Sequence, residues 1–193
     1  MNILITTALN PTLDVVAGAY AHWKLRQFFH EEVKIGIAGK DDAPTQWLLK
    51  ELKIEDVVRL EDSTEQFDVF VLWNAIRDKT ALLLPPVVEV QRVIEIIDRG
   101  DRGANDYSAF PKAEITVEPV TFSTIATERY QGRRLTLDQT CSQLLYCAIY
   151  IATDNLSPER TSPRDRAALR YLQTKMDPPL TLVRDLFVAT QPR

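Results

Sequence analysis

Val93–Gly100 reads V-I-E-I-I-D-R-G, and the interpretation of the whole chain starts from this stretch. Four of its eight residues are β-branched aliphatics, which predicts a strand buried on both faces, as in a parallel sheet. Ligands of open α/β sheets bind just beyond the carboxyl ends of such strands. We therefore expect Asp98 and Arg99, which follow the strand, to lie at a ligand-binding edge.

The rest of the chain alternates short apolar runs with helical patterns. Strands are predicted at residues 2–6, 33–38, 57–58, 67–73 and 93–97, with an edge strand at 113–117. Helices are predicted at residues 13–29, 45–52, 85–91, 123–130, 137–152, 161–175 and 180–189. This alternation indicates βαβ units with right-handed crossovers. The predicted fold is therefore α/β, a mostly parallel β-sheet flanked by helices, with a helical C-terminal third.

Composition sets broad limits on function. The chain has 193 residues, 45% hydrophobic and 26% charged, as in ordinary globular proteins, and we expect one domain over residues 1–193. The net charge of −4 argues against a nucleic-acid partner, because phosphate contacts need clustered Lys and Arg. No apolar run approaches the roughly 20 residues of a membrane span, and no signal peptide is visible. We expect a cytoplasmic protein without membrane contact.

The cysteines and histidines offer little for catalysis. Cys141 and Cys147 lie in an apolar segment and are expected to be buried thiols rather than metal ligands. The absence of a disulfide framework favours a reducing compartment. His22 and His30 fall on or at the end of the first predicted helix and are expected at the surface or the helix end. A catalytic triad therefore has no histidine at a strand end on which to build.

Two polar groups do follow predicted strands. Asn10–Asp14 follows the first strand, with Thr12 as the predicted N-cap of the next helix, and Asp98-Arg99 follows the strand at 93–97. No glycine-rich phosphate-binding motif occurs, and the charged loop Lys40–Asp42 is expected to be solvated. The opposite charges favour an ion pair in which Arg99 binds Asp14 or Asp98 and holds the loops together.

Several short motifs add a family resemblance. Asn10–Asp14 reads N-P-x-x-D, Ile94–Asp98 reads I-E-I-I-D, and Leu144–Ile149 reads L-L-x-x-A-I and is followed by Thr161–Asp165. In this order, over nearly the whole chain, they resemble the DHH phosphoesterase family, which includes manganese-dependent inorganic pyrophosphatases and exopolyphosphatases. The resemblance implies two adjacent manganese or magnesium ions that activate a water and clamp a phosphoryl group. It also implies a second, smaller substrate-binding domain, which we expect this chain to lack.

Most of the family's metal-ligand positions hold other residues here: Ala8, Thr12, Trp73 (or Asn74 after a shift by one), Arg99, Gly100 and Ala152. A gap that brings Asp154 to the last position breaks the match that follows. Alanine and tryptophan donate no ligand and arginine repels a cation, so we expect no metal and no other cofactor. Of the family's carboxylates, only Asp14 and Asp98 of the signature remain. Together with Asn10 and Arg99 they are predicted to form a vestigial active-site cleft, in which Arg99 replaces a metal charge beside Asp14.

The sequence thus favours a non-catalytic relative of the family, a pseudoenzyme that acts by binding. Its partner is expected to be another protein or a second copy, held by the edge at 113–117 or by the last helix. The alternative is a weak phosphoesterase, or a binder of a phosphate-containing small molecule, that uses Arg99, Arg129, Arg133 and Arg134 as anion contacts. A subunit that needs a second domain in trans is a third hypothesis.

Overall fold

A computed structural model describes residues 1–29, 31–75, 84–100, 110–116, 118, 120–176 and 180–190 of the chain. Its strands are β1 (Ile3–Thr7), β2 (Val33–Ile37), β3 (Val57–Arg59), β4 (Val69–Trp73), β5 (Val93–Arg99) and β6 (Ala113–Thr116). Its α-helices are α1 (Leu13–Phe28), α2 (Ala43–Glu51), α3 (Phe122–Gly132), α4 (Gln139–Ala152), α5 (Pro163–Gln173) and α6 (Leu180–Thr190). Two short 3-10 turns, η1 (Leu60–Asp62) and η2 (Val90–Arg92), complete the described elements.

The six strands form one parallel sheet in the order β3-β2-β1-β4-β5-β6, which confirms the predicted α/β class and the helical C-terminal third. Side chains of successive strand residues point to opposite faces of a sheet. Accordingly Ile97 belongs to the core on the helical face, whereas Ile96 belongs to a separate, smaller core on the other face. The sheet is therefore buried on both sides, as its apolar strands predict.

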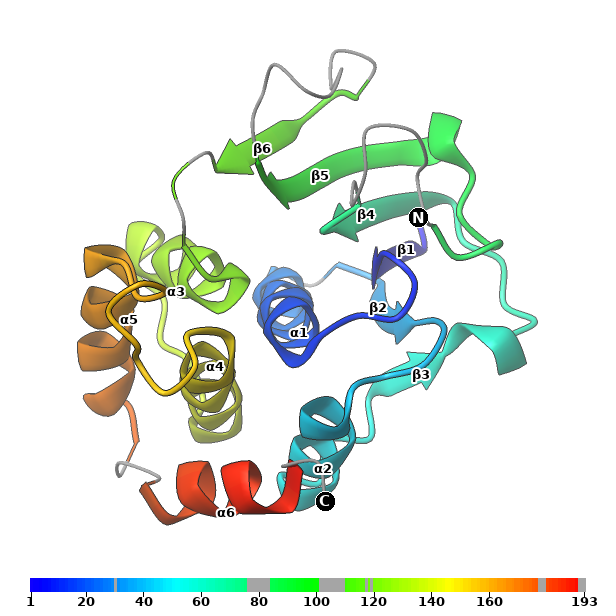
Figure 1. Cartoon of the computed structure of the whole chain (residues 1–193). Helices are drawn as coiled ribbons and strands as arrows, with labels where there is room; N and C mark the ends of the chain where they lie inside the picture. Colours follow the sequence, from blue (N-terminus) through cyan, green and yellow to red (C-terminus); the bar gives the residue numbers. More distant parts are fainter. Residues whose placement is uncertain are drawn as a thin grey trace.

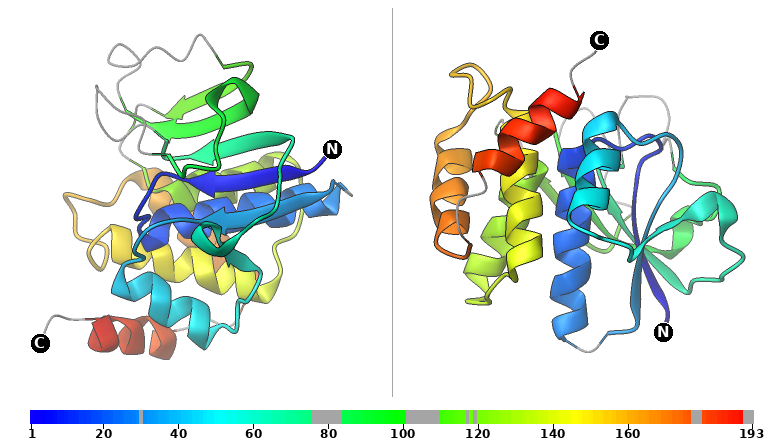
Figure 2. Two further views of the ribbon diagram at one scale, coloured as in Figure 1. Left: turned by 90° about the vertical axis from the view of Figure 1, so that its right-hand side faces the viewer. Right: turned by 90° about the horizontal axis from the view of Figure 1, so that it is seen from below.

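The helices gather on one side of the sheet (Figure 1). α1 packs on β1, β2 and β4 and is covered in turn by α3 and α4, so most of its residues are buried. α5 packs on α3 and α4, and α6 lies across α2 and α4, as the view from below shows (Figure 2). No helix of the described residues is both long enough and apolar enough to cross a membrane.

The predictions for residues 85–91 and for His22 are wrong. No helix runs from Pro85 to Gln91: the segment forms a turn and then η2, in which arrangement Val87 and Val88 both pack against the smaller core. His22 is not a surface residue but is buried, because it lies where α1 packs between α3 and the sheet, in contact with Trp73 of β4 and Arg129 of α3. His30 and Val117 lie outside the described residues.

Candidate functional site

The strand order reverses between β1 and β4, and ligands of doubly wound sheets bind beyond the carboxyl ends of the strands at such a point. Here the chain leaves β1 through Asn10 and enters α1, while β4 ends at Trp73. β5 lies beside β4 and ends at Arg99. The residues that the sequence singled out can therefore be placed relative to this edge.

Asp14 lies in the first turn of α1 and is almost completely buried, with 5% of its surface exposed. One carboxylate oxygen accepts the backbone N–H of Phe122 at 2.9 Å, and the other accepts that of Ser123 at 2.9 Å. These are the first two residues of α3, whose N–H groups have no partner within the helix. Burial raises the pKa of the Asp14 carboxyl, although Arg99 and these N–H donors act in the opposite direction. Asp14 thus joins the start of α1 to the start of α3.

Arg99, the last residue of β5, completes this arrangement. Its Nη1 lies 3.9 Å from Oδ2 of Asp14 and donates to the carbonyl of Val120, just before α3. Its guanidinium stacks on the ring of Phe122, 4.2 Å from the centroid, while 38% of the side chain stays exposed. The ion pair between Arg99 and Asp14 that the sequence suggested is therefore present.

Asp98 does not share this face. β5 continues through Arg99 because it pairs with β6 as far as Thr116, so Asp98 and Arg99 are consecutive strand residues that point to opposite faces. The expectation that both follow the strand is therefore wrong. Asp98 is completely buried, and its Oδ1 accepts the N–H of Arg99 at 2.7 Å.

Asn10 joins two loops at the same edge of the sheet. Its backbone has a left-handed φ of 55°, its N–H donates to the carbonyl of Ala38, and its Oδ1 accepts the N–H of Lys40 at 2.6 Å. Gly39 must be a glycine here, because its φ is +82° and an added Cβ would meet Oδ1 of Asn10 at 2.4 Å. Asn10 and Lys40 also line an open hollow of about 660 Å³.

The charged loop at Lys40–Asp42 has structural partners rather than only solvent. Asp42 caps α2 by accepting the N–H of Thr45 at 2.9 Å, and it also accepts the N–H of Leu13, at the start of α1, at 3.2 Å. Thr12 occupies the N-cap position of α1 as predicted, but its side chain makes no capping hydrogen bond. Asp42, from the neighbouring loop, accepts a hydrogen bond from the start of α1 instead. Asp41 pairs with Arg59 at 2.6 Å.

Trp73 fills the interior behind the Asp14–Arg99 pair. It is completely buried, its ring lies edge-on to Phe122 with centroids 6.0 Å apart, and its Nε1 donates to Nδ1 of His22 at 3.0 Å. α1 approaches so closely here that a Cβ on Gly18 would lie 2.7 Å from the indole. Asn74, the alternative to Trp73 in the motif comparison, is half-buried and has a left-handed φ of 52°.

A buried ionic cluster adjoins this region, and sequence reasoning missed it. Glu95 on β5 is 2% exposed and receives hydrogen bonds from Arg26 at 2.8 Å, Lys112 at 2.7 Å and Arg129 at 2.9 Å. Burial acts to raise the pKa of Glu95, but these partners outweigh it and hold the pKa well below its usual range. The available signal was a glutamate within an apolar strand, because such a charge requires a buried cation.

The same cluster corrects the alternative role given to three arginines. Arg129 is buried and is paired with Glu95 and, at 2.5 Å, with Glu114, so it is not available to an anion. Arg133 and Arg134 are exposed beyond the C-terminal end of α3, whereas Arg99 lies at its N-terminal end, roughly 16 Å away for a helix of this length. These arginines and Arg99 therefore do not form one anion site.

The last family motif also has a structural role. Oδ1 of Asp165 accepts the N–H of Thr121 and the hydroxyl of Thr124, while Oδ2 completes a capping box with Ser162 at the start of α5. Ala152 ends α4, and Asp154 is exposed in the turn beyond it, where it lines a different hollow of about 570 Å³ beside α6. Cys141 and Cys147 are buried free thiols, as predicted.

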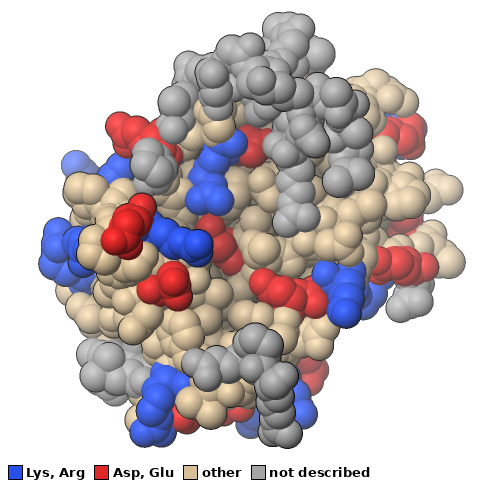
Figure 3. All heavy atoms as spheres, viewed as in Figure 1, with Lys and Arg blue, Asp and Glu red and all other residues tan. Residues whose placement is uncertain are grey.

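Lys, Arg, Asp and Glu side chains are intermixed over the face shown in Figure 3, and no large patch of one sign stands out there. Among the described residues, no three His, Cys, Asp or Glu side chains lie close enough together to hold a metal ion.

His22 gives the molecule an expected pH dependence. Burial and the charge of Arg129 hold the pKa of His22 well below 6.5, so the folded protein does not take up the proton that the unfolded chain binds below pH 6.5. The free energy of unfolding should therefore decrease as the pH is lowered, by about 2 kcal/mol from pH 6.5 to pH 5. Urea unfolding at several pH values measures this, and the His22→Gln variant should lose that part of the slope. An unchanged slope in the variant would contradict the assignment.

No family model and no curated protein matches the sequence. Solved structures do share the fold. One is a Methanococcus jannaschii protein assigned to the family II inorganic pyrophosphatases, with a TM-score of 0.73 and 17% identity over 97% of this chain and 61% of that one. Another is an exopolyphosphatase-related protein from Bacteroides fragilis, with a TM-score of 0.75 and 10% identity over 100% of this chain and 57% of that one. This chain thus spans about three fifths of each, and identities this low establish similarity of fold alone.

Proposed function

We propose that this chain is a degenerate DHH-type domain that holds no catalytic metal, does not hydrolyse phosphoanhydride or phosphodiester bonds, and acts by binding another protein. The Asp14–Arg99 pair carries this proposal. Asp14 is the carboxylate that the family resemblance assigns to a metal, yet both of its oxygens accept backbone N–H groups of α3. The cation beside it is a guanidinium that belongs to the chain itself.

The side chains that the structure describes at this edge do not fit a pair of divalent ions. A hard divalent cation requires several oxygen or imidazole ligands with supporting neighbours. Arg99 places a permanent positive charge 3.9 Å from the Asp14 carboxylate, and Trp73 offers an indole N–H, which is a donor only. This donor set gives no route to a metal-activated water.

The names of the two structural neighbours support descent from phosphoesterases, since one is assigned to the inorganic pyrophosphatases and the other is exopolyphosphatase-related. Binding of a phosphate-containing molecule is the weaker candidate, because Arg129 is already neutralised and Arg133 and Arg134 are remote from Arg99. Contact with a protein is favoured by exposed apolar side chains, namely Phe28 and Phe29 at the end of α1 and Val188 on α6.

The proposal is tested by assaying the chain with pyrophosphate, polyphosphate and a dinucleotide in the presence of Mn²⁺ or Mg²⁺. We expect no phosphate release above a protein-free blank, while an active inorganic pyrophosphatase assayed in parallel releases it. Calorimetric titration should show no Mn²⁺ binding tighter than millimolar, because the ligand set is incomplete. Hydrolysis that depends on Mn²⁺ and is abolished in an Asp14→Asn variant that remains folded would overturn the proposal.

A thermal-shift screen with pyrophosphate and polyphosphate separates the remaining alternatives. A ligand that binds only the folded state raises the melting temperature. A saturable rise would favour a phosphate-binding relic over a protein-binding domain, whereas no rise is the expected result. Light scattering over a range of concentrations then tells whether the protein partner is a second copy of the chain.

A further inference from the structure

We propose that Arg99 is a resident cation, which replaces a bound metal ion, ties α1, β5 and α3 together and keeps divalent ions out of this edge. The inference deepens the proposed function, since it says what holds the edge together without a metal. Its three contacts come from two parts of the chain: Asp14 in α1, and the Val120 carbonyl and the Phe122 ring at the start of α3.

A cation is needed here because Asp14 is buried. The carboxylate is removed from water, and an uncompensated buried charge is costly. The two N–H groups at the start of α3 supply about half an elementary charge through the helix dipole. Arg99 supplies a full positive charge at 3.9 Å, which changes the local sum of charges from about −0.5 to about +0.5, so the carboxylate no longer carries an excess negative charge.

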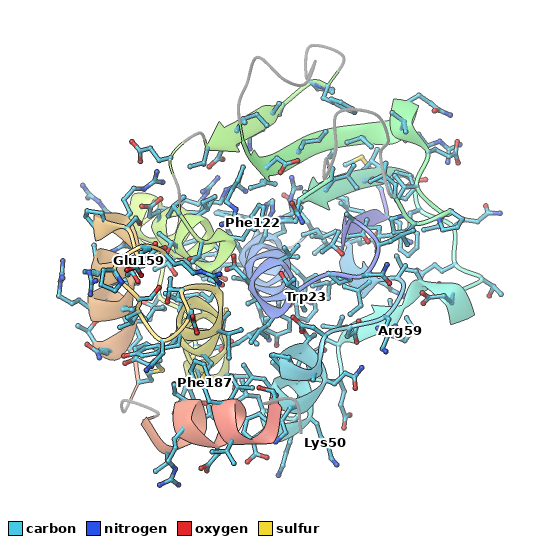
Figure 4. All side chains as sticks on the ribbon, in the orientation of Figure 1. Trp23, Lys50, Arg59, Phe122, Glu159 and Phe187 are labelled. Carbon is cyan, nitrogen blue, oxygen red and sulfur yellow. The ribbon has the colours of Figure 1, made fainter. Side chains whose placement is uncertain are left out.

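A guanidinium group fits this position better than a divalent metal ion does. It lies over the Phe122 ring, with its central carbon 4.2 Å from the ring centroid, and its N–H donates to the Val120 carbonyl. A divalent ion would need further carboxylates or imidazoles, and the neighbouring Trp73 gives none. Figure 4 shows Phe122 at the start of α3, on the side that faces α1, so the ring lies within the junction that Arg99 closes.

The position of Arg99 makes the idea testable by chemical rescue. With 38% of the side chain exposed, the space that Arg99→Ala vacates opens to solvent, so a small cation can enter it. We expect Arg99→Ala to lower the melting temperature by about 4–8 °C, from the loss of a partner of a buried charge. Methylguanidinium at up to about 20 mM should restore at least half of this loss in a saturable manner, whereas Mn²⁺ at the same concentration should not.

The matched control is Arg92→Ala. Arg92 pairs with Glu89, and both side chains are about half exposed, so this variant should change the melting temperature little and show no rescue. Wild-type protein receives the same additions, which corrects for any general effect of methylguanidinium. If Arg99→Ala does not fold, Arg99→Lys and Arg99→Met replace it, and Lys should be the more stable by several degrees.

An Arg99→Ala variant as stable as the wild type would overturn the proposal. So would rescue by Mn²⁺, which would mark an ion site, and so would a loss that neither additive restores, which would assign Arg99 to packing alone. Equal stability of the Lys and Met variants would also count against it. These outcomes concern stability, so they are distinct from the hydrolysis and metal-titration results that decide the proposed function.

Discussion

Asp14→Ala should destabilise the protein by about 3–4 kcal/mol. The substitution leaves the N–H groups of Phe122 and Ser123 without their acceptors in a buried place, at roughly 1–3 kcal/mol each, and it also removes the counter-ion of Arg99. Urea unfolding followed by the fluorescence of the buried Trp23 and Trp73 measures the change.

The control for this variant is Asp41→Ala. Asp41 also pairs with an arginine, Arg59, but that pair lies nearer the surface, so its loss should cost less than about 1 kcal/mol. A loss below 1 kcal/mol for Asp14→Ala would show that its two hydrogen bonds do not hold α3. If Asp14 were only the remnant of a metal site, with no structural role, its loss should be this small. The measured loss of stability therefore tells whether the Asp14 carboxylate has a structural role.

The fold was predictable from sequence because its strands are short apolar runs and its helices carry local signals. Asp138 caps α4 and Ser162 forms a capping box with Asp165, and both signals involve residues three positions apart. The predicted helix at 85–91 failed because two prolines suggested a helix start, whereas Val87 and Val88 pack on the far face of the sheet. That contact depends on tertiary structure and leaves no local signature.

The site was less predictable than the fold. The Arg99–Asp14 pair could be inferred because both residues lie near the carboxyl ends of parallel strands, which meet at one edge of the sheet. The continuation of β5 through Arg99 was not foreseen. The N–H groups that donate to Asp14, by contrast, lie 108 and 109 residues away in the chain. His22 was misplaced for the same reason, since Trp73 and Arg129, which help to bury it, lie 51 and 107 residues away in the chain.

Glu95 should prove at least as important for stability as Asp14. Its carboxylate receives Arg26, Lys112 and Arg129, so Glu95→Leu leaves three cations without their shared partner, and Arg129 is itself buried. Removing one side of a buried ionic cluster typically costs about 3–5 kcal/mol, and we expect a loss in that range by urea unfolding. Glu89→Leu is the matched control, because Glu89 pairs with Arg92 at the surface and should matter by about 0.5 kcal/mol.

A second substitution tells whether charge or packing is responsible for that loss. If the loss of stability in Glu95→Leu comes from cations that are left without a partner, the double variant Glu95→Leu, Arg129→Met should be more stable than Glu95→Leu, because it lacks the most deeply buried of the three cations. A double variant that is less stable than Glu95→Leu by the full cost of Arg129→Met alone would instead mean that the two residues act independently. The cluster would then be a set of separate surface-linked pairs, and the buried position of Glu95 between α1, α3 and β6 would need a different explanation.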